Sequence, residues 1–89
     1  MNEAPPARSR VLVLLFSVLR ERIGASTLAV DLEDPVTTHA LLERLAEAHP
    51  RIRATLPSIR VAVNQEYVGR EHLVRAGDEV ALITPVSGG

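Results

Sequence analysis

The stretch VLVLLFSV, residues 11–18, is a continuous apolar run rich in valine and leucine. It is shorter than an average helix, and its composition favours a strand buried within a sheet. Residues 20–24 are mostly charged and end in glycine, which predicts a turn. The next stretch, STLAVDL at residues 26–32, alternates in polarity and predicts a second strand, antiparallel to the first. The apolar side of this second strand holds Leu28, Val30 and Leu32.

One amphipathic helix is expected after this hairpin. Residues 33–35, Glu-Asp-Pro, end the strand, and Thr37 or Thr38 can cap the helix by accepting a bond from a backbone N–H. Helical periodicity over residues 39–48 predicts one apolar face. That face is expected to hold Leu41, Leu42, Leu45 and Ala48. Pro50 ends the helix near His49.

Three further strands are expected in the second half of the chain. They are predicted at residues 59–63, 66–68 and 79–84, after an irregular turn at 51–58 and with turns at 64–65 and 76–78. Pro85 ends the last strand because it has no backbone N–H to donate.

These elements predict a small α+β domain in which one main helix packs on one face of a mixed five-stranded sheet. The order suits a β-grasp roll, similar to ubiquitin, with the first and last strands side by side in the middle. We expect a disordered tail at residues 1–9, the β-grasp domain at 10–84 and a flexible tail at 85–89.

The composition excludes several classes of function. The 89 residues carry 10 basic and 11 acidic side chains, with a formal charge of -1 and no basic stripe. Binding to nucleic acid by phosphate neutralisation is therefore not expected. The absence of cysteine excludes disulfides, zinc–thiolate sites and a cysteine nucleophile.

The N-terminal part has the basic start and apolar middle of a secretory signal peptide but lacks its other features. Apolar residues 11–19 follow Arg8 and Arg10, but charged residues 20–22 come next and no cleavage site of the A-x-A kind is present. The apolar run is too short to span a bilayer. We therefore expect a cytoplasmic protein that does not associate with membranes.

No catalytic or metal-binding constellation stands out among the side chains. His39, His49 and His72 share no i, i+4 spacing, so we expect surface residues rather than metal ligands. Asp78 follows a glycine in a turn, where aspartate is expected for local hydrogen bonding. The serines lack the context of a nucleophile elbow. The remaining candidate is the C terminus itself, residues 87–89.

The stretch GDEVALITPVSGG, residues 77–89, resembles the C-terminal signature of the molybdopterin synthase small subunits, a family of sulfur-carrier proteins. VLVLLFSVLRERIG at 11–24, TTHALLERLAEAHP at 37–50 and VAVNQEYV at 61–68 are similar to that family's first strand and turn, helix and middle hairpin. The chain departs from the family at Thr84-Pro85, where Pro-Pro is common, and in residues 1–9, which have no counterpart.

The resemblance implies a protein that is not an enzyme on its own. An ATP-using adenylyltransferase, related to the enzymes that activate ubiquitin, adenylates the Gly89 carboxylate, and a sulfur donor converts it to a thiocarboxylate. The sulfur then passes to a cyclic pterin monophosphate to form the molybdopterin dithiolene. No cofactor or metal is bound by the carrier, since ATP is used by the activating enzyme.

The resemblance also assigns roles to the tail. Pro85, Val86, Ser87 and Gly88 are expected to thread into the active site of a partner. Glycine has no Cβ, so the end of the tail can pass through a narrow channel. Extended, residues 85–89 span roughly 17 Å.

By the same resemblance, Phe16, Tyr67 and Ile83 form the docking patch for the large catalytic subunit, in a heterotetramer with two copies of each chain. From the residues alone, these are the only Phe, the only Tyr and an aliphatic side chain of the last strand. An apolar patch with aromatic side chains on an open sheet face is typical of a partner site. The alternative that Phe16 fills the core stays open.

Other functions also remain open. The chain could be another β-grasp sulfur carrier, for thiamine or for tRNA thiolation, or a protein modifier whose Gly89 is joined to a target lysine. In a different class, it could be an adaptor whose Gly-Gly end is incidental. Adding one residue after Gly89 separates these classes, because only the adaptor would keep its function.

Overall fold

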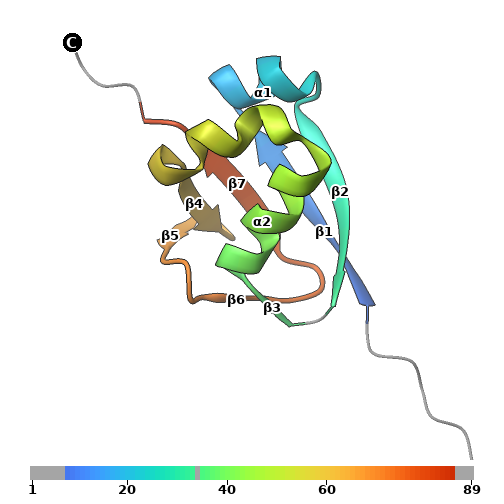
Figure 1. Ribbon diagram of the computed structural model, residues 1–89. Helices are drawn as coiled ribbons and strands as arrows, with labels where there is room; N and C mark the ends of the chain where they lie inside the picture. The colour runs from blue at the N-terminus through green and yellow to red at the C-terminus, as the bar shows by residue number, and fades with distance from the viewer. Residues whose placement is uncertain (1–7, 34, 86–89) are drawn as a thin grey trace, which may run out of the picture.

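The computed structural model describes residues 8–33 and 35–85 (Figure 1). A mixed five-stranded sheet in the order β2-β1-β7-β4-β5 carries helix α2 across one face, and β3 and β6 form a separate two-stranded sheet. The elements are β1 (Arg8–Leu15), α1 (Ser17–Ile23), β2 (Thr27–Glu33), β3 (Val36–Thr37), α2 (Thr38–Ala48), the 3-10 helix η1 (Pro50–Ser58), β4 (Arg60–Val63), β5 (Glu66–Val68), β6 (Leu73–Val74) and β7 (Glu79–Ile83). The α+β, β-grasp prediction is confirmed.

The first and last strands lie side by side in the middle of the sheet, as predicted. They run parallel, with Leu12 opposite Glu79 and Leu15 opposite Leu82, and β2 and β4 flank them antiparallel. Because strand side chains alternate between faces, every second residue points toward α2. The buried residues of β1 and β7 are Val11, Val13, Leu15, Val80 and Leu82.

Helix α2 begins and ends close to the predicted bounds. The Thr37 hydroxyl oxygen accepts a hydrogen bond from the Ala40 N–H at 3.1 Å, and His49 closes the helix by donating its N–H to the Leu45 oxygen at 2.8 Å. The buried face holds Leu41, Leu42, Leu45 and Ala46. Ala48 is exposed, so its assignment to this face was wrong. Its position in the last turn lies beside the edge strand β2, where it lines an open groove.

The N-terminal part differs from the prediction at two points. Strand β1 begins at Arg8, inside the segment assigned to a tail, while residues 1–7 lie outside the described residues. It ends at Leu15, and the apolar run continues as helix α1 instead of as a strand. Leu19 is fully buried and Ile23 packs on the core one turn later, which gives the helix its buried side. Gly24 ends the helix in the left-handed region at φ 87°.

Two short features depend on tertiary contacts. Residues predicted as an irregular turn form η1, which buries Ile52 against the core. The β3–β6 pair was not predicted, since each strand has two residues. Buried Thr38 supports this pair by donating its hydroxyl to the His72 oxygen at 3.0 Å. No helix within residues 8–33 and 35–85 is long and apolar enough to cross a membrane.

Hydrogen bonds of the Asn64 side chain link the predicted turn at residues 64–65 to the one at residues 76–78. Asn64 and Gln65 make the β4–β5 turn with φ values of 51° and 72°. The Asn64 amide donates to Asp78 Oδ1 at 3.1 Å, and its oxygen accepts from the Glu79 N–H at 3.0 Å. Asp78 Oδ2 accepts from the Arg75 N–H at 2.9 Å. This backbone N–H, followed by the Asn64 amide, lowers the pKa of Asp78 below its usual value of 3.8.

We expect Asp78→Asn to destabilise the protein by about 1 kcal/mol near neutral pH, because it removes a charged acceptor from both hydrogen bonds. Since folding lowers the pKa of Asp78, its contribution is complete above the unfolded pKa and is lost as pH falls through the folded pKa. Urea unfolding of both proteins at several pH values should therefore show a stability difference that shrinks below about pH 4. An equal difference at neutral and acidic pH would contradict this role of the charge.

Candidate functional site

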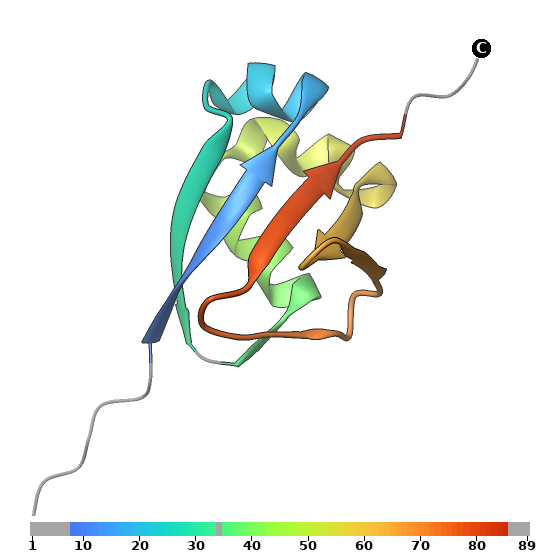
Figure 2. The ribbon, with the colours of Figure 1, turned by 180° about the vertical axis from the view of Figure 1, so that it is seen from behind.

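The face of the sheet opposite α2 is open and largely apolar. Figure 2 shows the strands from this side, with α2 behind them. The residues that alternate with the buried positions point outward here, because successive side chains of a strand lie on opposite faces. We define the open face by Leu12 and Leu14 of β1, Phe16, Ala81 and Ile83 of β7, Arg60 and Ala62 of β4, and Tyr67 of β5.

Pairing across the strands orders this open face into rows. Ala81 lies opposite Leu14 on one side and opposite Ala62 on the other, and Ala62 in turn lies opposite Tyr67. A continuous row of apolar and aromatic side chains therefore crosses four neighbouring strands. A second row starts at Ile83, which lies opposite Arg60.

The three residues predicted to dock a partner all belong to the open face. Phe16 is 44% exposed and follows Leu15, whose partner is Leu82, so Phe16 lies beside Ile83 where the parallel strands end. Tyr67 is 65% exposed and stands two strands away from Ile83. The alternative that Phe16 fills the core is therefore wrong.

The open face also contains residues that the sequence analysis did not single out. Arg60 stands between Ile83 and Tyr67, and its guanidinium carbon lies 6.0 Å from the centre of the Tyr67 ring. Leu12 is 43% exposed, although it lies in the most apolar stretch of the chain. Strict alternation with the buried residues Val11 and Val13 is the signal that could have identified Leu12.

The end of β7 directs the chain toward one end of the open face. Thr84 is half-buried and Pro85 is exposed, directly after Ile83. Since β1 and β7 are parallel, Pro85 leaves the sheet at the end where Phe16 lies. The other predicted tail residues, Val86, Ser87, Gly88 and Gly89, lie outside the described residues.

The histidines fall at separate places in the fold. His39 and His72 are exposed as expected, whereas His49 is half-buried at the end of α2. Within the described part of the chain, no three His, Cys, Asp or Glu side chains gather in a group that could hold a metal ion. The candidate site is therefore the open face, with the position where Pro85 leaves the sheet.

Single replacements of Phe16 and of its neighbour Leu15 should show, by their loss of unfolding free energy, which side chain lies on the surface and which lies in the core. We expect Phe16→Ala to cost about 1 kcal/mol or less of unfolding free energy, because the side chain is already half exposed. Leu15→Ala, at a site that is 1% exposed, should cost about 2–5 kcal/mol. Thermal or urea unfolding of the two variants measures both values, and equal losses would place Phe16 in the core.

Comparison with known proteins gives one consistent family. The sequence model of the ThiS family matches residues 13–89. The molybdopterin synthase sulfur carrier subunit of Dictyostelium discoideum is 40% identical over 80 residues, which cover 86% of this chain and 93% of that protein.

Solved structures of similar proteins share the fold. The crystal structure of SAMP1, small archaeal modifier protein 1, from Haloferax volcanii has a TM-score of 0.82 at 32% identity and covers 91% of this chain and 100% of that one. One chain in a complex of subunits 1 and 2 of the molybdopterin-converting factor from Helicobacter pylori has a TM-score of 0.61 at 18% identity, covering 90% and 99%. The chain therefore belongs to the ThiS family, as a relative of the molybdopterin synthase sulfur carrier subunits.

Proposed function

We propose that this protein is a sulfur carrier that works as the small subunit of a molybdopterin synthase. The observation that carries the proposal is the position of Pro85 at the end of the open face, beside Phe16 and Ile83. A partner bound on that face would receive the last residues of the chain directly. The match of the ThiS family through residue 89 supports a working role for the terminus.

The chemistry starts at the carboxylate of Gly89, which is a poor electrophile because it is anionic and lacks a leaving group. Attack of this carboxylate on ATP forms an acyl adenylate and releases pyrophosphate. A sulfur donor then attacks the carbonyl carbon, AMP leaves, and Gly89 carries a thiocarboxylate. Since ATP is used by a separate adenylyltransferase, the carrier needs no cofactor or metal of its own, and we expect it to act in the cytoplasm.

Sulfur delivery requires a second partner, the large catalytic subunit. The thiocarboxylate sulfur attacks a carbon of a cyclic pterin monophosphate and displaces an oxygen substituent from that carbon as the C–S bond forms. Water then hydrolyses the bond between sulfur and the acyl carbon. The sulfur remains on the pterin and Gly89 returns to a carboxylate. Two deliveries complete the dithiolene, which suits an assembly with two copies of each subunit.

The open face offers the docking surface for this partner. Phe16 and Tyr67 expose aromatic side chains, which contribute disproportionately to binding energy when a partner buries them. Ile83 completes the patch at the end where Pro85 leaves the sheet. Gly88 and Gly89 then let the chain thread a narrow channel into the active site of the large subunit.

A protein-modifier function is the second candidate, favoured by the likeness to small archaeal modifier protein 1. This function starts with the same adenylation of Gly89 but ends in an isopeptide bond to a lysine of another protein. Both functions need a terminal Gly89 carboxylate, so the product formed on Gly89 distinguishes them.

We expect incubation with ATP, a sulfur source and host extract to replace one oxygen of Gly89 by sulfur. Intact-mass measurement should detect the change, and fragmentation should locate it at Gly89. One alanine appended after Gly89 should abolish the change, because the terminal carboxylate then belongs to a different residue. The matched control carries the same alanine inserted after Met1 and should gain sulfur normally.

Three outcomes separate the candidates. Sulfur gain that depends on ATP supports the carrier, and transfer to the pterin by added large subunit supports the molybdopterin pathway. A high-mass product linked through Gly89 to lysine, without a thiocarboxylate that transfers to the pterin, favours the modifier. An unchanged mass in an extract that thiolates a known carrier would contradict both.

A further inference from the structure

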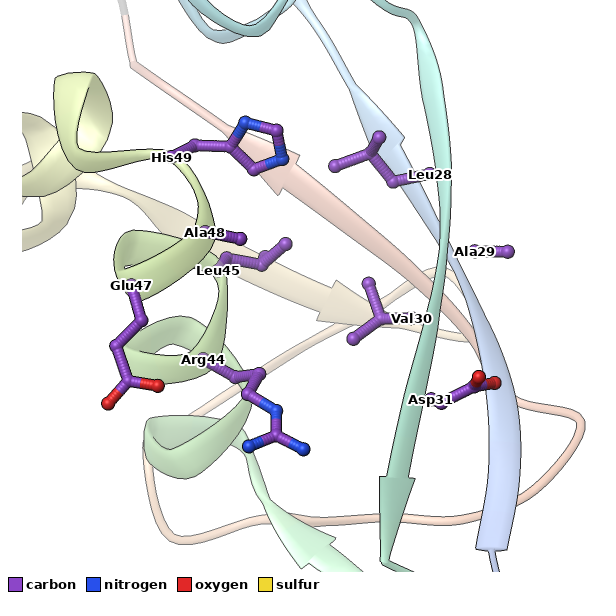
Figure 3. Close-up of a pocket in the computed structure, with 9 residues that line it drawn as sticks. All are labelled: Leu28, Ala29, Val30, Asp31, Arg44, Leu45, Glu47, Ala48 and His49. Carbon is purple, nitrogen blue, oxygen red and sulfur yellow. The ribbon is translucent and has the colours of Figure 1, made fainter.

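A groove lies between the edge strand β2 and helix α2, on the side of the sheet away from the open face. It has a volume of about 460 Å³. Figure 3 shows Leu28 and Val30 of β2 pointing across it toward Leu45 and His49 of the helical wall. Ala48 lines the same wall and is exposed. The groove is therefore lined largely by apolar side chains, and the described part of the chain does not fill it.

The outer edge of β2 provides backbone groups along this groove. The Leu15 N–H donates to the Ser26 oxygen at 2.8 Å, which marks Leu15 and Ser26 as a hydrogen-bonded pair. Such pairs alternate along antiparallel strands, so the backbone of Leu28 and Val30 faces β1 and that of Ala29 faces outward. Strand β2 has seven residues, TLAVDLE, without the Pro or Lys that commonly protects an edge.

Arg44, Asp31 and Glu47 are charged side chains that line the groove. Figure 3 shows the Arg44 guanidinium reaching between α2 and β2, while the Glu47 carboxylate points away from the strand. Within the described residues, no carboxylate lies within 4.0 Å of the Arg44 guanidinium. Asp31 pairs instead with Arg10 at 3.1 Å. The groove therefore combines an apolar floor, an outward-facing strand edge and, at one end, a guanidinium that has no carboxylate within 4.0 Å among the described residues.

We propose that this groove binds an extended segment of a partner protein that adds a strand to β2. Alternate side chains of the segment would be apolar and fill the space between Val30 and Leu45, while a carboxylate of the segment pairs with Arg44. Main-chain hydrogen bonds at Ala29 would supply affinity that does not depend on sequence. The bound segment is thus acidic at one end and alternately apolar over the rest.

A single strand is the occupant that the charge of the groove favours. One carboxylate of a bound segment can pair with the Arg44 guanidinium while the apolar side chains of the segment lie between β2 and α2. The groove and the open face lie on different sides of the sheet. A bound segment would therefore leave Phe16, Ile83 and the exit of the chain accessible, and the proposal is independent of sulfur transfer.

The test uses the full chain labelled with ¹⁵N and two synthetic peptides. Because the added strand could run parallel or antiparallel to β2, the two peptides carry their glutamate near opposite ends. They are acetyl-Thr-Glu-Thr-Val-Thr-Val-Thr-amide and acetyl-Thr-Val-Thr-Val-Thr-Glu-Thr-amide. We expect saturable amide shifts confined to β2 and α2 with at least one peptide. Arg44→Glu should weaken that binding at least tenfold, and replacing the peptide Glu by Lys should restore it for this variant alone.

A second pair of variants tests strand addition. Ala29→Pro removes an outward N–H at an edge position and should weaken binding at least tenfold, whereas Ala29→Ser keeps the N–H and should bind normally. Arg44→Glu should gain sulfur at Gly89 as the native chain does, which separates this proposal from the proposed function.

Several results would overturn the groove proposal. One is that neither peptide causes saturable shifts at concentrations up to about 2 mM, which corresponds to a negligible affinity. A second is that the shifts map to Phe16, Tyr67 and Ile83. A third is that Arg44→Glu binds the peptides with Glu and with Lys in the same order of affinity as the native chain does. Shifts along β2 that depend on protein concentration without peptide would assign the edge to a second copy.

Discussion

Pairing between the first and last strands, β1 and β7, organises the whole molecule. The two strands are parallel neighbours, so every other element lies in the single connection between them. Closing such a long connection is unfavourable in entropy and needs compensation from burial. Val13, Leu15, Val80 and Leu82 provide it by burying their side chains in the core, at about 1.5–3 kcal/mol each.

The same pairing determines both the core and the open face. Alternation along β1 and β7 places one set of side chains in the core and leaves the other set, including Leu14 and Ala81, on the open face. Parallel direction brings Pro85 to the end of the sheet where Phe16 is exposed. The proposed docking surface and the position where Pro85 leaves the sheet are thus two consequences of one strand arrangement. The groove beside β2 lies on the opposite side of the sheet.

Sequence patterns predicted those parts of the fold in which local periodicity and burial agree. The alternation at Leu28, Val30 and Leu32, the apolar stripe of α2 and the turn at Asn64 all have local signals. Helix α1 was missed because the apolar run continues through Leu15 and Leu19, hiding the change from a period of two to 3.6.

Features that arise between distant segments could not be predicted in this way. The two-residue strands β3 and β6 exist through pairing with each other, and the groove arises where β2 passes the last turn of α2. Phe16, Tyr67 and Ile83 were identified by resemblance to a family, while Arg60 joins them only through cross-strand pairing. Side-chain direction in the strands, rather than residue type, determines membership of the open face.

The central claim is that the open face binds the large catalytic subunit and thereby presents the chain terminus to it. Hydrogen–deuterium exchange of the protein, alone and with the large subunit of a molybdopterin synthase, measures this most directly. The account predicts slower exchange at the ends of β1 and β7, around Phe16 and Ile83, and in β5 at Tyr67. Protection confined to α2 and β2, with unchanged exchange at Phe16 and Ile83, would contradict it.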